Sequence, residues 1–173
     1  MLIVMAGLPG TGKSTLARQI AAALQGIVLD KDTVRSALFP GKFLDHSVAQ
    51  DDLVVSLMLQ AAEYLFRKYP RMAVIIDGRP FSRRYQIEVV VEFAARMQEP
   101  IKIVECTCAD ESAKHRLDHA RQYGTHLAKN RGYELYLSTK ARWEEILQPK
   151  LLINTDCNLD DCMAQVMQYL RSD

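Results

Sequence analysis

The sequence predicts an α/β fold with a central parallel sheet of about five strands and helices on both faces. Two observations carry this prediction. Short apolar runs alternate along the chain with longer amphipathic segments, as in strands joined by crossover helices. Several of the runs are apolar throughout, which is typical of strands buried on both faces. With 173 residues the chain has the size of one domain, so residues 1–173 are expected to form a single unit.

The expected strands are short and rich in aliphatic residues. They cover residues 2–6, 26–29, 72–76, 101–106 and 151–154. Apolar residues at helical spacing predict helices between and after these strands. The helices are expected at residues 15–24, 47–68, 82–98, 110–121, 133–147 and 159–170, with a further short helix after Asp32. Strand and helix therefore alternate from the first residues to the last.

The charge balance limits the kinds of partner. The chain has 22 Lys and Arg against 21 Asp and Glu, a formal net charge of +1. A nearly neutral protein is not expected to carry a large nonspecific nucleic-acid surface. The apolar start is too short for a signal-peptide core, and no apolar run reaches the length of a membrane span. These features predict a soluble, cytoplasmic protein with no membrane partner, and they leave the oligomeric state open.

The cysteines and histidines do not match a metal site. Cys106 and Cys108 form a C-x-C pair, and Cys157 and Cys162 are separated by four residues. Neither spacing is typical of zinc sites, so reduced structural thiols are expected. His115 and His119 have the spacing of a helical metal pair, but no further ligand accompanies them, and we interpret them as surface residues.

A glycine-rich segment between the first strand and the first helix indicates phosphate binding. Residues 7–14 read G-x-x-x-x-G-K-S, the pattern of a phosphate-binding loop (P-loop). In such a loop, backbone N–H groups and a helix N-terminus surround the phosphates, the lysine reaches the β- and γ-phosphates, and the serine binds Mg²⁺. The predicted cofactors are therefore ATP and Mg²⁺. The predicted nucleotide-binding residues are Gly7, Leu8, Pro9, Gly10, Thr11, Gly12, Lys13, Ser14 and Thr15.

A second group of polar residues follows the second strand. Asp32 is the first candidate for a general base that orients or deprotonates an attacking hydroxyl, and Asp30 is the second candidate. Arg35 lies one helical turn after Asp32 and is expected to bind the acceptor or its phosphate. The alternative is that Asp32 is only a helix N-cap and Arg35 a solvated charge.

A third group follows the strand at residues 72–76. Asp77 is expected to hold Mg²⁺ together with Ser14, or alternatively to cap the next turn. Arg79 is predicted to bind the acceptor. Two interpretations are open for Arg83 and Arg84: they bind the acceptor, or they start the next helix, with Ser82 as its cap.

A helical lid is expected at about residues 115–133. Two helices joined by a polar, arginine-bearing segment are typical of an element that closes over ATP and supplies charge to the transferring phosphoryl group. Arg116 and Arg121 are the candidates for a catalytic arginine, followed by Arg131, although each is also explained as a solvated charge. Thr155 and Asp156 follow the last strand, where a loop can face the adenine.

These motifs resemble those of a known group of enzymes. Residues 7–15 followed by Lys31-Asp32-x-x-Arg35 are similar to the phage-type polynucleotide 5′-hydroxyl kinases and the small predicted kinases that include zeta toxins. Glu105 to Cys108, Arg116-Leu117 and Arg142-Trp143-Glu144 extend the similarity. The resemblance implies a P-loop NTPase-type three-layer fold, a general base at Asp32, an acceptor-binding arginine at Arg35 and a lid arginine.

The lid departs from the pattern of that group. The group tends to show Arg-Leu-x-x-Arg, whereas Arg116-Leu117 is followed by Ala120 at that position and Arg121 comes one residue later. A shift of one residue rotates a side chain by about 100° around a helix.

The combined prediction is an ATP-dependent kinase that transfers the γ-phosphate to a hydroxyl acceptor. A polynucleotide 5′-hydroxyl is the first acceptor suggested by the resemblance, and a nucleoside, sugar or antibiotic is the alternative. A nucleotide-binding switch or partner-binding ATPase is the alternative from another class. An acceptor base such as Asp32 separates the two classes, because a switch does not need one.

Overall fold

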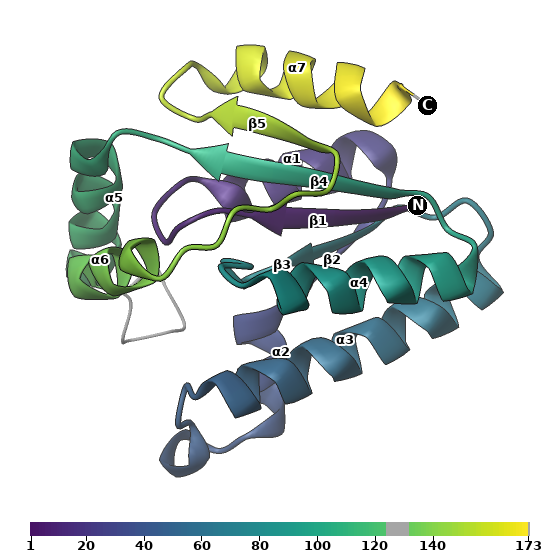
Figure 1. Ribbon diagram of the computed structural model, residues 1–173, viewed down its shortest axis with the longest axis horizontal. Coiled ribbons are helices and arrows are strands. Elements are labelled where there is room, and N and C mark those ends of the chain that lie inside the picture. The colour runs from purple at the N-terminus through teal and green to yellow at the C-terminus, as the bar shows by residue number, and fades with distance from the viewer. Residues whose placement is uncertain (124–131, 173) are drawn as a thin grey trace.

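A single parallel sheet of strand order β2-β3-β1-β4-β5 forms the centre of the protein (Figure 1). The computed structural model describes residues 1–123 and 132–172. The strands are β1 (Leu2–Ala6), β2 (Ile27–Asp30), β3 (Val74–Asp77), β4 (Ile101–Thr107) and β5 (Lys150–Asn154). All neighbouring pairs are parallel. The expected strands are confirmed, with bounds that differ by one or two residues.

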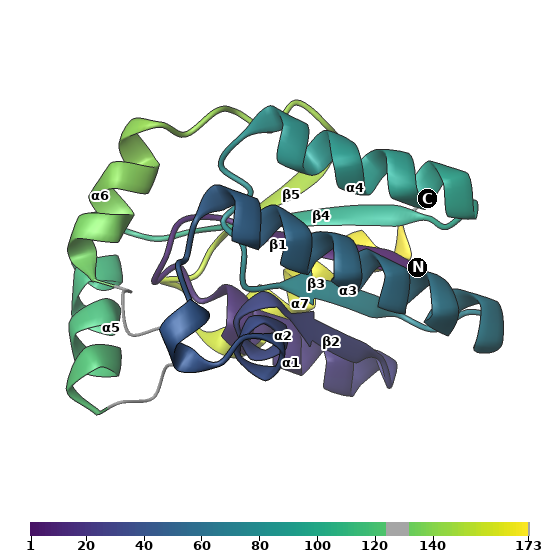
Figure 2. The same cartoon turned by 90° about the horizontal axis from the view of Figure 1, so that it is seen from below.

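Helices cover both faces of the sheet. Side chains of β1 alternate between the two faces: Leu2 and Val4 belong to one apolar cluster, and Ile3 and Met5 belong to the other. The first cluster packs against α3 (Val48–Lys68) and α4 (Arg84–Met97), and the second against α1 (Lys13–Leu24) and α7 (Leu159–Arg171). Figures 1 and 2 show these pairs on opposite sides of the sheet. This is the three-layer fold of P-loop NTPases, as predicted.

The remaining helices lie at the carboxyl ends of the strands. They are α2 (Lys31–Leu38), the 3₁₀ turn η1 (Gly41–Phe43), α5 (Asp110–Gln122) and α6 (Tyr133–Ala141). Both views place α5 and α6 side by side beyond the strand ends (Figures 1 and 2). The Asp110 carboxylate joins them, since it accepts hydrogen bonds from the Tyr136 hydroxyl at 2.7 Å and from Lys140 Nζ at 2.6 Å. Parallel strands thus bring all the loops that can bind a ligand to one edge.

The chain after α6 differs from the prediction. A helix is expected over residues 133–147, but α6 ends at Ala141 and no helix follows before β5. The Glu144 backbone N–H donates to the Ser82 carbonyl at 2.9 Å, and the Glu144 carboxylate accepts from the Arg84 backbone N–H at 2.9 Å. This carboxylate therefore caps α4 from a distant part of the sequence. Accordingly α4 begins at Arg84 with Arg83 as its N-cap, and the alternative that Ser82 caps this helix is wrong.

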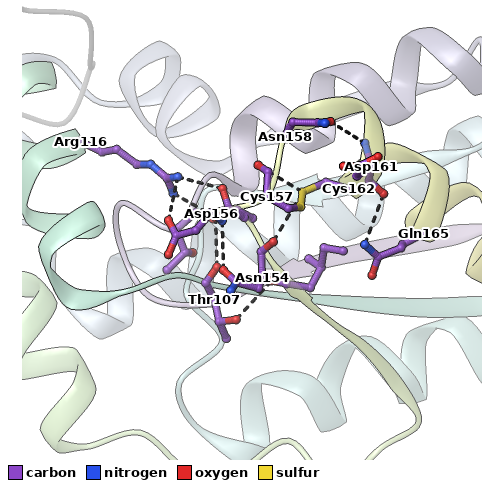
Figure 3. The surroundings of a disulfide bond; sticks show 12 residues. Thr107, Arg116, Asn154, Asp156, Cys157, Asn158, Asp161, Cys162 and Gln165 are labelled. Atoms are coloured by element: carbon purple, nitrogen blue, oxygen red, sulfur yellow. Dashed lines mark hydrogen bonds and ion pairs between the residues drawn. A yellow bond between two sulfur atoms is a disulfide. The ribbon is translucent and has the colours of Figure 1, made fainter.

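The cysteines also depart from the expectation that they are all reduced. Cys157 and Cys162 form a disulfide (Figure 3), whereas Cys106 and Cys108 are free. The turn before α7 folds back onto the first turn of that helix and brings the two Cα atoms to 6.5 Å. Two cysteines with four residues between them do not predict such a turn. Burial raises the pKa of the Cys106 thiol to about 12, which makes this free cysteine unreactive.

Loss of the disulfide is expected to lower the free energy of unfolding by about 2 kcal/mol, because the bond closes a small loop and so reduces the conformational entropy of the unfolded chain. Cys157 is exposed, so Cys157→Ser removes the bond without placing a hydroxyl in the core. Urea unfolding measures the effect with and without reductant. Reductant should lower the midpoint of the wild type and leave that of Cys157→Ser unchanged; equal midpoints for all four samples would contradict this expectation.

None of the described helices is long and apolar enough to cross a membrane.

Candidate active site

The segment from Gly7 to Gly12 forms a tight loop between β1 and α1. Gly7 has a φ of 130°, and a Cβ at this position would lie 2.2 Å from the Cys106 carbonyl oxygen. Gly12 has a φ of 81° at the N-cap of α1. L-residues with side chains rarely adopt either conformation, so the glycines permit a loop that a longer side chain would prevent. The predicted requirement for glycine is confirmed at these positions.

The loop forms one wall of a cavity of about 650 Å³, called here the loop cavity. Opposite walls come from the β2–α2 junction, from Asp77 and from Arg116 of α5. Lys13 is 6% exposed, and its Nζ donates to the Leu8 carbonyl oxygen at 2.7 Å. The lysine ammonium therefore lies against the phosphate loop, where an anion bound by the backbone N–H groups would meet it.

Two oxygen donors in the loop cavity fit a magnesium ion. Ser14 lies in the first turn of α1, Asp77 ends β3, and both line the cavity. Asp77 is 1% exposed, and its Oδ1 has no hydrogen-bond partner among the described residues. A buried carboxylate oxygen without a donor is costly unless a cation satisfies it. The described residues contain no cluster of three or more His, Cys, Asp or Glu, so phosphate oxygens and water would complete a Mg²⁺ shell.

The two aspartates at the β2–α2 junction have different structural roles. Asp30 is the N-cap of α2, and its Oδ1 accepts from the Thr33 backbone N–H at 2.7 Å. Asp32 lies in the first turn and is 6% exposed. Its Oδ1 is 3.5 Å from Lys31 Nζ and 3.4 Å from Arg35 Nη1. The interpretation of Asp32 as the helix cap is therefore wrong, and its carboxylate lies among cations instead.

A second cavity, of about 270 Å³, lies beside the loop cavity and is called here the arginine cavity. Its walls come from α2, the start of α3, the β3–α4 connection and α6. Lys13 and Asp32 line both cavities. The phosphate-loop lysine and the candidate base thus stand at the boundary between the two spaces.

Arg35 is held by protein groups at the edge of the arginine cavity. Its Nη2 forms an ion pair with Asp51 of α3, and its Nη1 donates to Nδ1 of His46 at 2.6 Å. Asp51 also accepts from Lys31 Nζ at 2.9 Å. The predicted proximity of Arg35 to Asp32 is confirmed, and the binding of the acceptor by Arg35 stays a prediction. Sequence reasoning missed Asp51, because it resembles an acid at the start of a helix. The loop at residues 40–46 is a predicted candidate wall of the acceptor pocket, and its last residue, His46, lines the arginine cavity.

The protonation state of His46 links this network to pH. Burial and the Arg35 guanidinium lower the pKa of His46 below its ordinary value of 6.5, so the neutral ring accepts the hydrogen bond from Arg35. The unfolded chain gains this proton at a higher pH than the folded protein does. Stability from the neutral ring is therefore present above pH 6.5 and is lost as the pH falls below it.

His46→Gln is expected to flatten the acid side of the stability profile, because glutamine can accept from Arg35 without titrating. Urea unfolding across a pH series, with wild type and variant in parallel, measures the difference in slope. The wild type should lose more free energy of unfolding than the variant as the pH falls below 6.5. Parallel profiles would show that His46 does not titrate as described.

The candidate lid arginines occupy different places. Arg116 lines the loop cavity and donates to Thr155 Oγ1 at 3.0 Å and to the Thr155 carbonyl at 2.9 Å. It also donates to Asp156 Oδ1 at 3.2 Å (Figure 3). Arg121 is exposed near the end of α5 and lines neither cavity. Arg131 and most of the residues between the two helices lie outside the described part of the chain.

The arginines after β3 line the arginine cavity. Arg79 is 4% exposed and forms an ion pair with Asp52 at 2.6 Å. Arg83 lies beside it and forms an ion pair with Glu144 at 2.7 Å. Arg142, which follows α6, also lines this cavity, although it was not among the predicted site residues. It belongs to the Arg142-Trp143-Glu144 segment of the resemblance, but helical periodicity placed it inside an expected helix and gave it no role.

The three-layer fold and the glycine loop define a P-loop NTPase-type protein. The chain belongs to the AAA_33 family, described as an AAA domain, whose model matches residues 2–146. A comparison with curated protein sequences gives no match.

Solved structures share the fold. A putative kinase from Chloroflexus aurantiacus has a TM-score of 0.74 at 18% identity, with 98% of each chain covered. A gluconokinase from Sinorhizobium meliloti has a TM-score of 0.70 at 14% identity, covering 97% of this chain and 90% of its own. The APS kinase CysC of Mycobacterium tuberculosis, solved with AMPPNP and APS, has a TM-score of 0.70 at 16% identity, covering 99% and 97%.

Proposed function

We propose that this protein is an ATP-dependent kinase that transfers the γ-phosphate of ATP to a hydroxyl group of a small molecule. The observation that carries the proposal is the pair of adjoining cavities, because Lys13 and Asp32 line both of them. A nucleotide switch needs only the loop cavity. Two adjoining spaces that meet at a phosphate-loop lysine and a buried carboxylate suit the transfer of a group from one ligand to another.

Within this proposal, the chain's own residues supply position and charge. The phosphate loop and Lys13 bind the triphosphate, and Ser14 with Asp77 would hold Mg²⁺, which neutralises phosphate charge when bound. Asp32 accepts the proton of the acceptor hydroxyl as its oxygen attacks the γ-phosphorus and the bond to the β-phosphate oxygen breaks. Lys31 and Arg35 keep the Asp32 carboxylate in place.

Arg116 is proposed to act on the nucleotide rather than on the acceptor. It lines only the loop cavity, and its hydrogen bonds to Thr155 and Asp156 fix it beside the loop after β5. That loop packs on the phosphate loop, since Thr155 Oγ1 donates to the Thr11 carbonyl at 3.0 Å. We therefore infer that Arg116 and this loop bind the base or ribose. For Arg121, the prediction is still that its positive charge stabilises the transferring phosphoryl group.

The size of the arginine cavity favours a small acceptor. A volume of about 270 Å³ is close to the lower end of small-molecule pockets, and α3 and α6 both contribute to its lining. The gluconokinase and the APS kinase are named for small acceptors, which agrees with this choice. The polynucleotide 5′-hydroxyl suggested by the resemblance is the second candidate. Cytoplasmic location is proposed with the kinase function, because ATP is available there.

An acceptor screen with γ-labelled ATP tests the proposal. Sugars, hydroxy acids, nucleosides, aminoglycosides and oligonucleotide 5′ ends are each incubated with enzyme, Mg²⁺ and the labelled nucleotide. We expect label in a small-molecule fraction and none in the oligonucleotides. Label confined to oligonucleotide ends would favour the second candidate. Nucleotide hydrolysis that no acceptor changes would favour a switch or ATPase.

A further inference from the structure

The charge of the arginine cavity exceeds what phosphoryl transfer requires. Six basic side chains of the described residues line it against two carboxylates. The basic side chains are Lys13, Lys31, Arg35, Arg79, Arg83 and Arg142, and the carboxylates are Asp32 and Asp51. Lys13 belongs to the phosphate loop, and Lys31 and Arg35 form ion pairs with the two carboxylates. The other three arginines have no part in holding the base or the nucleotide.

Two of these arginines are held from outside the cavity. Asp52 pairs with Arg79 at 2.6 Å, and Glu144 pairs with Arg83 at 2.7 Å. Neither Asp52 nor Glu144 lines the cavity, whereas both arginines do. A guanidinium group has five N–H donors in a planar fork, and one carboxylate oxygen uses only part of them. The ion pairs engage Nη2 of Arg79 and Nη1 of Arg83, and the other nitrogens of each fork form no ion pair with a described residue.

The third arginine reaches the same cavity from a distant segment. Arg79 and Arg83 belong to the connection between β3 and α4, and Arg142 follows α6. Arg142 is exposed, and no carboxylate among the described residues forms an ion pair with it. With Asp52 and Glu144 counted, six basic side chains stand against four carboxylates, and this excess of positive charge favours a bound anion.

We propose that the acceptor carries an oxyanion group, such as a carboxylate, phosphate or sulfate, that binds to Arg79, Arg83 and Arg142 while its hydroxyl lies at Asp32. This inference rests on the proposed kinase function and adds the charge class of the acceptor. Guanidinium groups bind planar and tetrahedral oxyanions through paired hydrogen bonds. Because Arg79 is buried, its hydrogen bonds to such an anion would be stronger than those of an exposed arginine. A neutral polyol gains none of these charge-assisted contacts.

Inorganic sulfate is the probe for the oxyanion site. The enzyme is first saturated with Mg²⁺ and AMPPNP, so that the phosphate loop is filled, and is then titrated with sulfate. Binding is followed by calorimetry and by the fluorescence of Trp143, the single tryptophan, which adjoins Arg142. We expect saturable binding that Arg79→Gln and Arg142→Gln each weaken by roughly tenfold to a hundredfold.

The control is Arg96→Gln, because Arg96 is an arginine of α4 that is 69% exposed and lines neither cavity. Its sulfate affinity should equal that of the wild type. Arg142 is exposed, so its variant tests the site even if Arg79→Gln does not fold. Absence of saturable sulfate binding, or equal affinity in wild type and Arg142→Gln, would overturn the inference.

Matched acceptor pairs separate this inference from the kinase function. Gluconate is compared with sorbitol, and glycerol phosphate with glycerol, in the assay with γ-labelled ATP. A higher kcat/KM for the anionic member supports the inference, and the pair that shows it distinguishes a carboxylate from a phosphate. Transfer to the neutral members at equal or higher kcat/KM would refute the oxyanion site and leave the kinase function intact. Sulfate binding without transfer to any compound would support the site and count against the kinase function.

Discussion

Lys13→Ala is expected to remove both tight binding of ATP and phosphoryl transfer. The ammonium group of Lys13 is buried against the phosphate loop, and Lys13 is the one described lysine that lines both cavities. Loss of a preorganised charge at a developing phosphoryl transition state typically lowers kcat by about 10² to 10³. Equilibrium binding of a fluorescent ATP analogue and the label-transfer assay measure the two effects.

The control for this variant is Lys114→Ala, which removes an exposed lysine that pairs with Asp118 on α5. It should bind ATP and transfer label like the wild type. If Lys13→Ala bound ATP with unchanged affinity while it remained folded by circular dichroism, the loop cavity would not be the nucleotide site.

Asp32→Asn is expected to separate binding from chemistry. The amide keeps the shape of the carboxylate but cannot take the proton of the acceptor, so transfer should fall by about 10² to 10⁴. ATP affinity should change little, since the phosphate loop supplies the contacts to the triphosphate. Single-turnover transfer and ATP binding are measured on the same preparation.

Asp30→Asn is the matched variant, because asparagine is as good an N-cap as aspartate and preserves the start of α2. We expect it to retain transfer. Loss of transfer in Asp30→Asn with full transfer in Asp32→Asn would move the base to Asp30. Full transfer in both variants would show that neither aspartate is the base.

The sequence predicts the sheet well because its signals are local. Each strand is a short apolar run, and the glycine loop follows β1 in a pattern typical of phosphate-binding turns. Asp77 was also predictable as a cavity residue, because it ends a buried strand at the carboxyl edge of the sheet. Its unsatisfied Oδ1 adds an observation that the sequence does not contain.

The parts of the site that were missed depend on contacts between distant segments. Asp51 reaches Arg35 only because α3 packs beside α2, and Glu144 ends the expected helix early because it caps α4. Arg142 lies between the end of α6 and Glu144 and lines the arginine cavity. Helical periodicity describes one segment at a time, so it cannot report which segment supplies a cap or a counter-ion to another.

The same limit applies to the predicted roles of charged residues. Asp32 and Asp30 have similar capping potential in the sequence, and the hydrogen bonds of Thr33 show that Asp30 is the cap. Arg116 and Arg121 are equivalent on a charge basis, yet only Arg116 lines a cavity. Spacing along the chain identified both arginines as candidates. The hydrogen bonds of Arg116 to the β5–α7 loop distinguish it from Arg121.

Partition of the γ-label between acceptor and water tests the kinase assignment most directly. The enzyme is incubated with γ-labelled ATP, Mg²⁺ and the acceptor selected by the screen, and ADP, labelled inorganic phosphate and labelled acceptor are quantified together. We predict one labelled acceptor for each ADP formed, with this transfer lost in Asp32→Asn. Recovery of all the label as inorganic phosphate with every acceptor would contradict the account and identify the protein as an ATPase.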